Sequence, residues 1–333
     1  MNIAMIYSKG DMSTAFPYDF KGREDNESVE DVKKALISLG HEVVVVPADD
    51  YMFETLKKMI GKNNLDLVFN LADDGYNLNT QLEPQIPAML DLLGIPYTGS
   101  DHLCLGNCLN KVRTKHLLLA NGLPTPKFKI FNRKTSNKLD ISQLKFPLIV
   151  KPSREDGSIG IKRDAVVDDQ KSLIKKVNDT IEKYNQPALV EEFIEGREVD
   201  VGIIGREKLI VLPVLEINFT LPTGERNFFS YNGKWEEMSI YYLGTTYQCP
   251  TRLNVALKKT LKKMAKKAYK LMGVKDYGRI DFRISNDGNI YILEVNPNPD
   301  ISRDSGLARM ARAYKMTYEN LIDRIVKTSL DNE

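Results

Sequence analysis

The stretch that decides the fold is Gly278-Arg279-Ile280-Asp281-Phe282-Arg283-Ile284-Ser285-Asn286-Asp287-Gly288-Asn289-Ile290-Tyr291-Ile292-Leu293-Glu294-Val295-Asn296. Two runs of β-forming residues flank Asp287-Gly288, a pair that is typical of a two-residue hairpin loop. With that loop, counting outward pairs Asp281 with Glu294 and Arg279 with Asn296. Residues two apart on a strand share a face, so these four polar side chains are expected to form one cluster.

Two members of this cluster are carboxylates on facing strands, and like charges in that arrangement destabilise a sheet. A bound cation removes the repulsion. Oxygen ligands of this kind suit Mg²⁺, which keeps several waters and shares the phosphates of a substrate. Asp281, Glu294 and Asn296 are therefore candidate metal ligands. The alternative is a solvated outer face of the hairpin, and a three-residue loop with a bulge would change the pairing.

The bulk properties indicate a globular protein of two or three domains. The chain has 333 residues, of which 42% are hydrophobic and 28% charged, and its formal charge is +2. This charge gives no reason to expect nucleic-acid or membrane partners, and no apolar run approaches the roughly 20 residues that span a bilayer. The chain begins with an apolar strand rather than a signal peptide, and its three cysteines lack metal-site spacing. Both features predict a reducing, cytoplasmic location.

The first hundred residues alternate between strand and helix patterns. Strands are expected at 2–7, 42–46 and 65–70, and helices at 28–39, 51–60 and 81–93. This order predicts a parallel sheet with helices on both faces. No G-x-G-x-x-G follows the first strand, so a dinucleotide site there is not supported.

The remainder of the chain mixes helices and strands. Helices are expected at 107–120, 170–183, 252–272, 304–313 and 317–327, and strands at 146–151, 188–193, 199–204 and 209–217. Residues 220–250 show no periodicity and are predicted to be a long functional loop. Lysines cover one side of the 252–272 helix, which indicates a solvated face; the alternative is a surface for an anionic ligand such as nucleic acid.

The residues suited to phosphates lie outside any P-loop, because the sequence has no G-x-x-x-x-G-K-[ST]. Lys151 ends an apolar strand immediately before a polar loop, where Gly157 and Gly160 would let backbone N–H groups approach phosphate oxygens. Lys111 is a second candidate at the start of a helix. Glu198 is either a ribose ligand or an ordinary surface residue.

Eight short motifs occur in one order along the chain. They are Pro-Tyr-Thr-Gly-Ser (96–100), Asn-Lys-x-x-Thr-Lys (110–115), Val-Lys-Pro-Ser-Arg-Glu (150–155), Glu-Glu-Phe-Ile-x-Gly-x-Glu (191–198), Tyr-x-x-Lys (231–234), Gln-Cys-Pro (248–250), Arg-x-Asp-Phe (279–282) and Glu-Val-Asn (294–296). With them the chain resembles the ATP-grasp superfamily, and within it the D-alanine–D-alanine ligases, from about Leu65 to Ser305.

The resemblance implies an α/β fold of the α+β ATP-grasp type. A doubly wound, parallel-sheet N-terminal domain would occupy residues 1–103. Two ATP-grasp subdomains would follow at 104–193 and 194–333, and their antiparallel sheets would enclose ATP.

The resemblance also implies residue roles. Lys111 and Lys151 would contact the ATP phosphates, and Ser158 would lie in the loop that covers them. The adenine hinge would be Glu191, Glu192, Phe193 and Ile194, with Glu198 on the ribose. Asp281, Glu294 and Asn296 would bind two Mg²⁺ ions, or Mn²⁺. Arg279 would stabilise charge at the reacting carboxylate, and Lys234 would lie in the loop that closes over the site.

The activity implied is an ATP-dependent carboxylate–amine ligation that forms a peptide-like amide through an acyl phosphate. The substrates would be amino acids or small peptides, and the family suggests a homodimer. Two alternatives are an ATP-grasp enzyme with another outcome, carboxylation or phosphoryl transfer, and a non-catalytic ATP-binding module. Release of a free amide rather than a phosphorylated product separates the first reading from the other enzyme.

The sequence departs from the ligases in the amino-acid motifs. Their Ser-Glu-containing loop after the first strand is replaced by residues 8–16, and their His-Gly motif is replaced by residues 71–76. Asp300 follows the last metal ligand where the family has a glycine before Met-Thr. A carboxylate there disfavours a substrate carboxylate and favours an amine, so a first substrate other than D-alanine is predicted. Ser305 matches a family serine that contacts the second substrate.

Overall fold

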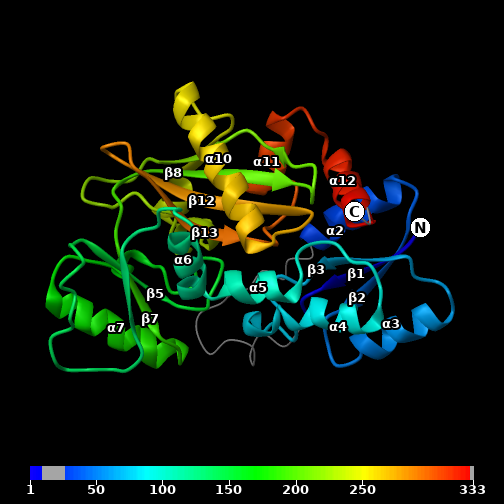
Figure 1. The fold of residues 1–333 in the computed structure, drawn as a ribbon, viewed down its shortest axis with the longest axis horizontal. Helices are drawn as coiled ribbons and strands as arrows, with labels where there is room; N and C mark the ends of the chain where they lie inside the picture. The colour runs from blue at the N-terminus through cyan, green and yellow to red at the C-terminus, as the bar shows by residue number, and fades with distance from the viewer. Residues whose placement is uncertain (10–26, 331–333) are drawn as a thin grey trace.

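The computed structural model describes residues 1–9 and 27–330, and these form three sheets with helices packed against them (Figure 1). The first sheet is parallel, in the order β2-β1-β3, with β1 at Asn2–Tyr7, β2 at Glu42–Pro47 and β3 at Leu67–Leu71. Alternate residues of β1 enter two different cores. Ile3 and Met5 pack with helix α2 (Glu27–Ser38), whereas Ala4 and Ile6 pack with α3 (Met52–Gly61) and α4 (Gln85–Leu93). The predicted parallel sheet with helices on both faces is confirmed.

The second sheet is antiparallel and holds the strand that carries Lys151. Its order is β4-β7-β5-β6, with β4 at Phe128–Phe131, β5 at Leu148–Pro152, β6 at Val166–Val167 and β7 at Ala188–Glu192. Helix α7 (Gln170–Tyr184) buries Leu173 and Val177 against it. Strands β4 and β6 were not expected from the sequence, because β6 has two residues and β4 is only partly buried.

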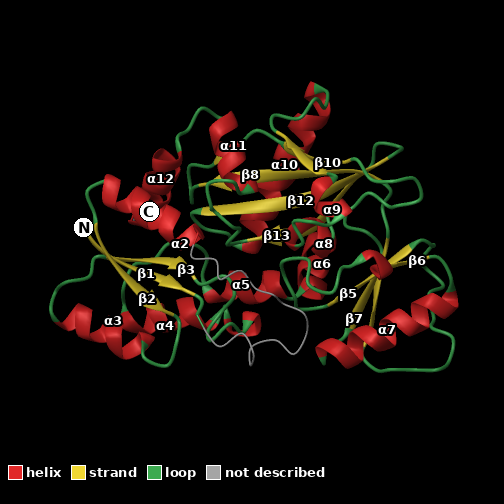
Figure 2. Ribbon diagram, turned by 180° about the vertical axis from the view of Figure 1, so that it is seen from behind, coloured by secondary structure: helices red, strands yellow, loops and turns green. Residues whose placement is uncertain are grey.

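The third sheet is also antiparallel and carries the hairpin quoted above. Its order is β11-β10-β8-β12-β13, with β9 paired to β8. The strands are β8 (Gly196–Ile204), β9 (Ile210–Val211), β10 (Leu215–Phe219), β11 (Thr245–Gln248), β12 (Tyr277–Ser285) and β13 (Ile290–Asn296). Helix α10 (Val255–Met272) covers one face, and α11 (Gly306–Ala313) covers the other with α12 (Tyr318–Leu330) beside it (Figure 2). None of the helices in residues 1–9 and 27–330 combines the length and the apolar character that crossing a membrane requires.

The hairpin loop has three residues rather than the predicted two. The N–H of Ser285 donates to the carbonyl of Asn289 at 2.8 Å, and Gly288 closes the turn with φ +87°. A β-bulge then inserts Leu293, so that Phe282 pairs with Ile292 while Asp281 pairs with Glu294. The extra loop residue and the extra strand residue cancel. The pairings of Asp281 with Glu294 and of Arg279 with Asn296 are therefore confirmed, although the predicted loop was wrong.

Three other expectations need correction. The helix expected at 107–120 is two helices, α5 (His102–Leu109) and α6 (Lys111–Ala120), because Asn110 is extended and its side chain caps α6 by accepting from the N–H of Arg113. The strand expected at 209–217 is split into β9 and β10. Residues 220–250 hold α8 (Tyr231–Trp235), α9 (Ile240–Leu243) and β11, so they are not one structureless loop.

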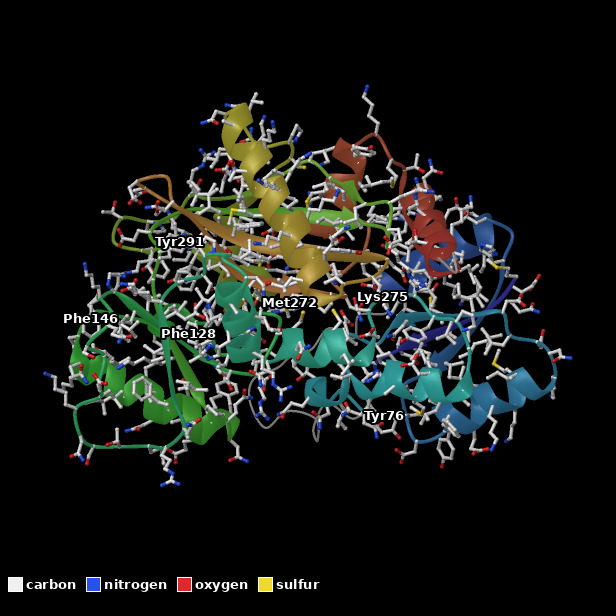
Figure 3. The ribbon with its side chains drawn as sticks, viewed as in Figure 1. Tyr76, Phe128, Phe146, Met272, Lys275 and Tyr291 are labelled. Atoms are coloured by element: carbon white, nitrogen blue, oxygen red, sulfur yellow. The ribbon has the colours of Figure 1, made fainter. Side chains whose placement is uncertain are left out.

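The first and third sheets are joined at the buried carboxylate of Asp276. It accepts a hydrogen bond from the N–H of Gly99 at 2.8 Å and two from Arg206 at 2.7 and 3.2 Å. Gly99 has φ +91°, and a Cβ there would lie 2.6 Å from Oδ1 of Asn298. Nearby, Lys275 pairs with Asp101 at 2.9 Å beside the start of α5 (Figure 3). Ser100 donates from its N–H to Oδ1 of Asn298 and from its hydroxyl to the carbonyl of Pro297, both at 3.3 Å, which holds residues 96–100 against residues 297–298.

The three sheets fall within the three ranges expected for domains: β1–β3 within 1–103, β4–β7 within 104–193 and β8–β13 within 194–333. The core of α2, however, also contains residues of α11 and α12. The limits of independent domains therefore stay predictions.

Candidate active site

Two adjoining cavities lie between the sheets. The larger, of about 630 Å³, lies between the ends of β1 and β3 and residues 297–301, and the smaller, of about 110 Å³, lies between β5, β7 and the β12–β13 hairpin. Four residues line both cavities: Gly157, Lys234, Arg279 and Asn296. A ligand in one cavity is therefore adjacent to a ligand in the other, at a point where two cationic side chains converge.

A buried carboxylate between two lysines forms one wall of the smaller cavity. Glu191 is 1% exposed, and its two oxygens lie 3.1 Å from the Nζ atoms of Lys115 and Lys151. Burial acts to raise the pKa of Glu191, but the charges of Lys115 and Lys151 outweigh it, and the net shift is downward. Burial lowers the pKa of Lys115 to about 8. Lys115 was not singled out from the sequence, although it ends the Asn-Lys-x-x-Thr-Lys motif.

Lys111, the first residue of α6, lies at the edge of the metal-ligand cluster. Its Nζ is 2.9 Å from Oε2 of Glu294 and 3.3 Å from Oδ1 of Asp156. Burial acts to lower the pKa of Lys111, but Glu294 and Asp156 outweigh it and raise that pKa. Burial acts to raise the pKa of Glu294, but the charges of Lys111 and Lys151 outweigh it and lower that pKa to about 2. Both groups are therefore charged near neutral pH.

Arg279 is fixed by a fork of two hydrogen bonds. Its Nε and Nη2 donate to the two oxygens of Asp281 at 2.7 and 2.9 Å, and Nδ2 of Asn296 donates to the same carboxylate at 2.8 Å. Asp200, which pairs with Asp281 across β8 and β12, lies 3.7 Å from Nε of Arg279. Burial, and then the charge of Asp281, raises the pKa of Asp200 well above its usual value. Asp200 gave no sequence signal, because its partners are set by sheet pairing.

The proposed metal ligands fit a hard divalent cation in their chemistry. Asp281, Glu294 and Asn296 supply carboxylate and amide oxygens, and all three line the smaller cavity. In this structure Arg279 and Lys111 neutralise the two carboxylates. Within residues 1–9 and 27–330, no three His, Cys, Asp or Glu side chains are grouped to hold a metal ion by themselves. Ligand oxygens from waters and phosphates would complete such a site, as is usual for Mg²⁺.

The loop at 156–160 is folded back under helix α8. Gly157, Ser158 and Gly160 all have φ between +61° and +78°, and a Cβ at Gly160 would lie 2.6 Å from Cγ of Pro152. Nε1 of Trp235 donates to the carbonyl of Gly157 at 2.8 Å, and Oγ of Ser158 donates to the carbonyl of Phe229 at 3.3 Å. These two bonds fasten the 220–250 segment over both cavities.

One part of the smaller cavity is lined by apolar side chains and two carboxylates. Phe193, Ile194, Phe228 and Leu293 line it together with Glu192 and Glu198. Glu198 is held by Nη2 of Arg283 at 3.1 Å and by the N–H of Phe229 at 3.2 Å. Burial raises the pKa of Glu198. Leu293 faces the same cavity as its neighbour Glu294 because of the β-bulge, so the regular alternation used on the sequence could not reveal it.

The larger cavity contains Asp300 and other carboxylates. Asp300 Oδ1 accepts from the N–H of Ser302 at 2.8 Å, which fixes the loop after β13. Ser305 is absent from the described lining of both cavities and instead caps α11, accepting from the N–H of Ala308 at 3.2 Å. Its contact with a substrate stays a prediction. The divergent loop at 8–16 lies outside the described residues from Gly10 onward.

Comparison with known proteins identifies relatives that cover most of this chain. A family model described as "D-ala D-ala ligase C-terminus" matches residues 117–327. A Sinorhizobium fredii protein called y4sG is 33% identical over 89% of this chain and 85% of its own length. The D-alanine–D-alanine ligase of Carboxydothermus hydrogenoformans is 30% identical over 90% of this chain and 91% of its own. That of Thermotoga maritima is 32% identical, with 92% of each chain covered.

Solved structures agree on the fold. The D-alanine–D-alanine ligase of Bacillus anthracis, complexed with ATP, superposes with a TM-score of 0.75 at 24% identity, covering 99% of this chain and 97% of the other. The VanG D-Ala:D-Ser ligase of Enterococcus faecalis gives a TM-score of 0.73 at 21% identity, with 98% and 99% covered. The superpositions extend over all three sheets.

Proposed function

The chain belongs to the D-alanine–D-alanine ligase family of ATP-grasp enzymes, and from that premise we propose that it joins a substrate carboxylate to a substrate amine through an acyl phosphate made from ATP. The observation that carries the proposal is the lining shared by the two cavities. A nucleotide in the smaller cavity and an amino acid in the larger one would meet at Gly157, Lys234, Arg279 and Asn296. Reactions of this kind depend on holding both partners in attacking geometry.

The smaller cavity suits ATP. Its apolar end, with Phe193 and Leu293, offers a slot for a base, and the fixed carboxylate of Glu198 offers an acceptor for ribose hydroxyls. Lys151 lines the same cavity and would take the phosphates. Glu191 keeps Lys151 in place, and Lys115 keeps Glu191 in place.

Asp281, Glu294 and Asn296 would hold two Mg²⁺ ions, or Mn²⁺, which offset the charge of the phosphates when bound. Lys111 lies beside Glu294 and would move its ammonium from the carboxylate to a phosphate oxygen. Glu294 already carries its charge near neutral pH, because Lys111 and Lys151 lower its pKa to about 2. Glu294 can therefore bind a cation without losing a proton.

The reaction has two balanced steps. A carboxylate oxygen attacks the γ-phosphorus and ADP leaves; the amine nitrogen then attacks the acyl carbon, and inorganic phosphate leaves with loss of the amine proton. Negative charge develops on the acyl oxygen in the second step. Arg279, fixed by Asp281, would donate to that oxygen, and Lys234 would balance the transferred phosphoryl group.

The acyl phosphate must be protected from water. The bond from Trp235 to the Gly157 carbonyl joins the 220–250 segment to the phosphate loop and would keep the junction closed during the reaction. We expect amino acids or small peptides as substrates, with a first substrate other than D-alanine because of Asp300. A cytoplasmic location and a homodimer remain predictions from the sequence.

The test is phosphate release from ATP and Mg²⁺ with a panel of D- and L-amino acids and dipeptides, read together with the masses of the products. We expect phosphate and an amide in equal amounts. A D-Ala-D-Ala product would overturn the prediction drawn from Asp300 but not the ligase. Release of a phosphorylated product, without an amide from any pair, would overturn the ligase itself.

A further inference from the structure

The part of the larger cavity that is remote from ATP is lined by an acidic subsite. We define this subsite by Asp73, Glu83, Tyr277 and Asp300, which all line the larger cavity and none of which lines the smaller one. They come from residues 71–83, from β12 and from the loop after β13. The proposed reaction gives none of these four side chains a role, since it uses Arg279 and Lys234, which also line the smaller cavity.

The carboxylates that line the larger cavity outnumber its cations. Among the described residues its lining holds five carboxylates, Asp73, Asp74, Glu83, Asp156 and Asp300, and three cations, Lys9, Lys234 and Arg279. Lys234 and Arg279 line both cavities, and Arg279 is bound to Asp281. Lys9 is exposed at the rim. The described lining therefore has more carboxylates than cations, and Lys234, whose charge acts on Asp73 and Asp300, offsets them only in part.

Glu83 is a buried carboxylate with little compensation. It is 7% exposed, and within residues 1–9 and 27–330 the one hydrogen bond of its carboxylate is a long contact of 3.4 Å from Nδ2 of Asn298. Burial, and then the charges of Asp156 and Asp73, raises the pKa of Glu83 well above its usual value. A buried carboxylate without a cation is costly unless a ligand supplies the charge.

Tyr277 gives a second, independent observation. It is 2% exposed, and it lies two residues before Arg279 on β12, on the strand face that lines the cavity. In the described part of the chain its hydroxyl makes no hydrogen bond, whereas buried Tyr269 donates to the carbonyl of Gly205 at 2.7 Å. A buried hydroxyl that opens onto a cavity without a partner is suited to a polar group of a ligand.

We propose that the acidic subsite binds a cationic group of the substrate that takes no part in the reaction, an ammonium or guanidinium carried on a side chain. The substrate would then be a basic amino acid, or a small peptide that contains one. The inference rests on the proposed function for the position of the reacting carboxylate. Charge-assisted hydrogen bonds to Glu83, with the Tyr277 oxygen as a further acceptor, would hold the group.

The selectivity can be measured with pairs of amino acids that differ mainly in charge. We would compare kcat/KM for arginine with citrulline, and for lysine with norleucine, in both enantiomers and with product masses. A preference of roughly 10- to 100-fold for the basic member is expected, since hydrogen bonds to charged groups are strong. Equal rates for both members of each pair would overturn the subsite, while amide formation would still support the ligase.

Substitutions in the acidic subsite test which residues cause the preference for the basic amino acid. Glu83→Gln keeps an acceptor for Asn298 and should lower the preference about tenfold, and Asp73→Asn, which changes a side chain on the exposed side of the cavity, should lower it less. Glu182→Gln, an exposed change in α7, is the matched control and should leave the preference unaltered. A preference that survives both Glu83→Gln and Asp73→Asn would place the recognition elsewhere and overturn the assignment.

Binding without ATP separates the two proposals. Calorimetric titration with arginine and citrulline reports on the subsite even if no product forms. Tighter binding of arginine that is lost in Glu83→Gln, together with no phosphate release from any substrate, would support the subsite and count against the proposed function. Equal binding of arginine and citrulline would overturn the subsite in the absence of any chemistry.

Discussion

The Nζ atom of Lys111 lies 2.9 Å from Oε2 of Glu294, which links the start of helix α6 to the edge strand β13. The same ammonium lies 3.3 Å from Asp156 in the phosphate loop, so three segments far apart in sequence meet on one charge. The lysine neutralises a carboxylate that we assign to the metal site. Glu294 is accordingly the residue whose charge is expected to matter most at the junction of the cavities.

Replacing Glu294 by Gln removes the charge and keeps the shape. We expect phosphate release to fall by about 100-fold or more, because a metal contact and the partner of Lys111 are lost together. The Mg²⁺ concentration for half-maximal rate should rise. Asp287→Asn, the same change in the exposed loop of the hairpin, should have little effect. An unchanged rate and Mg²⁺ dependence in Glu294→Gln would contradict the assigned metal site.

Leu293 is expected to contribute to ATP binding through its apolar surface. Leu293→Ala removes three carbons from a partly buried side chain, which costs roughly 1–2 kcal/mol and corresponds to an increase of about 5- to 30-fold in KM for ATP. The value of kcat should change little. Leu92→Ala, at a leucine that is 84% exposed on α4, is the control. A loss confined to kcat would show that Leu293 does not contact the nucleotide.

The bond from Trp235 to the Gly157 carbonyl should keep water out. Trp235→Phe keeps an aromatic ring and deletes the donor, and one neutral hydrogen bond is worth about 1 kcal/mol. We expect about a fivefold rise in phosphate released without amide, measured as the ratio of phosphate to amide product. Tyr242→Phe, in the exposed α9, should leave this ratio at its wild-type value. A ratio of phosphate to amide of one in both variants would argue against a role of this hydrogen bond in excluding water.

Lys115 should make stability depend on pH in the alkaline range. Its folded pKa of about 8 is below the unfolded value of about 10.4, so between these values the unfolded chain binds more protons than the folded one. The free energy of unfolding contributed by this group therefore rises with pH. From pH 7 to 9.5 the wild type should gain roughly 2 kcal/mol relative to Lys115→Met, measured by urea unfolding. Parallel profiles for the two proteins would contradict the lowered pKa.

The hairpin shows how sequence reasoning can reach the right pairing by a wrong route. The alternation of side chains along each strand, with an assumed two-residue loop, placed Asp281 opposite Glu294. The structure has the same pair with a longer loop and a bulge at Leu293. The bulge is invisible in the sequence, because a leucine fits either face. The pairing of the polar residues was therefore predictable from alternation, whereas the contact of Leu293 with the smaller cavity was not.

Other features depended on contacts between distant segments. The break at Asn110 comes from a side-chain cap in a sequence that reads as continuous helix, and the two-residue strand β6 is formed by pairing with β5. Asp200 and Tyr277 acquire their surroundings from neighbouring strands and loops. Local periodicity reports on burial of an element, and it says nothing about which buried polar group meets which cavity.

The buried Asp276 carboxylate has a consequence for how this protein can diversify. This carboxylate ties Gly99 to Arg206, and Asn298 fits only against a residue without a Cβ. A functional protein must therefore keep these partners together: residues 96–100, 276 and 298. A recombinant that exchanges the first hundred residues with those of a relative would separate these partners. Such an exchange therefore requires a relative that also carries a glycine at position 99, whereas point changes among the cavity side chains leave these contacts in place.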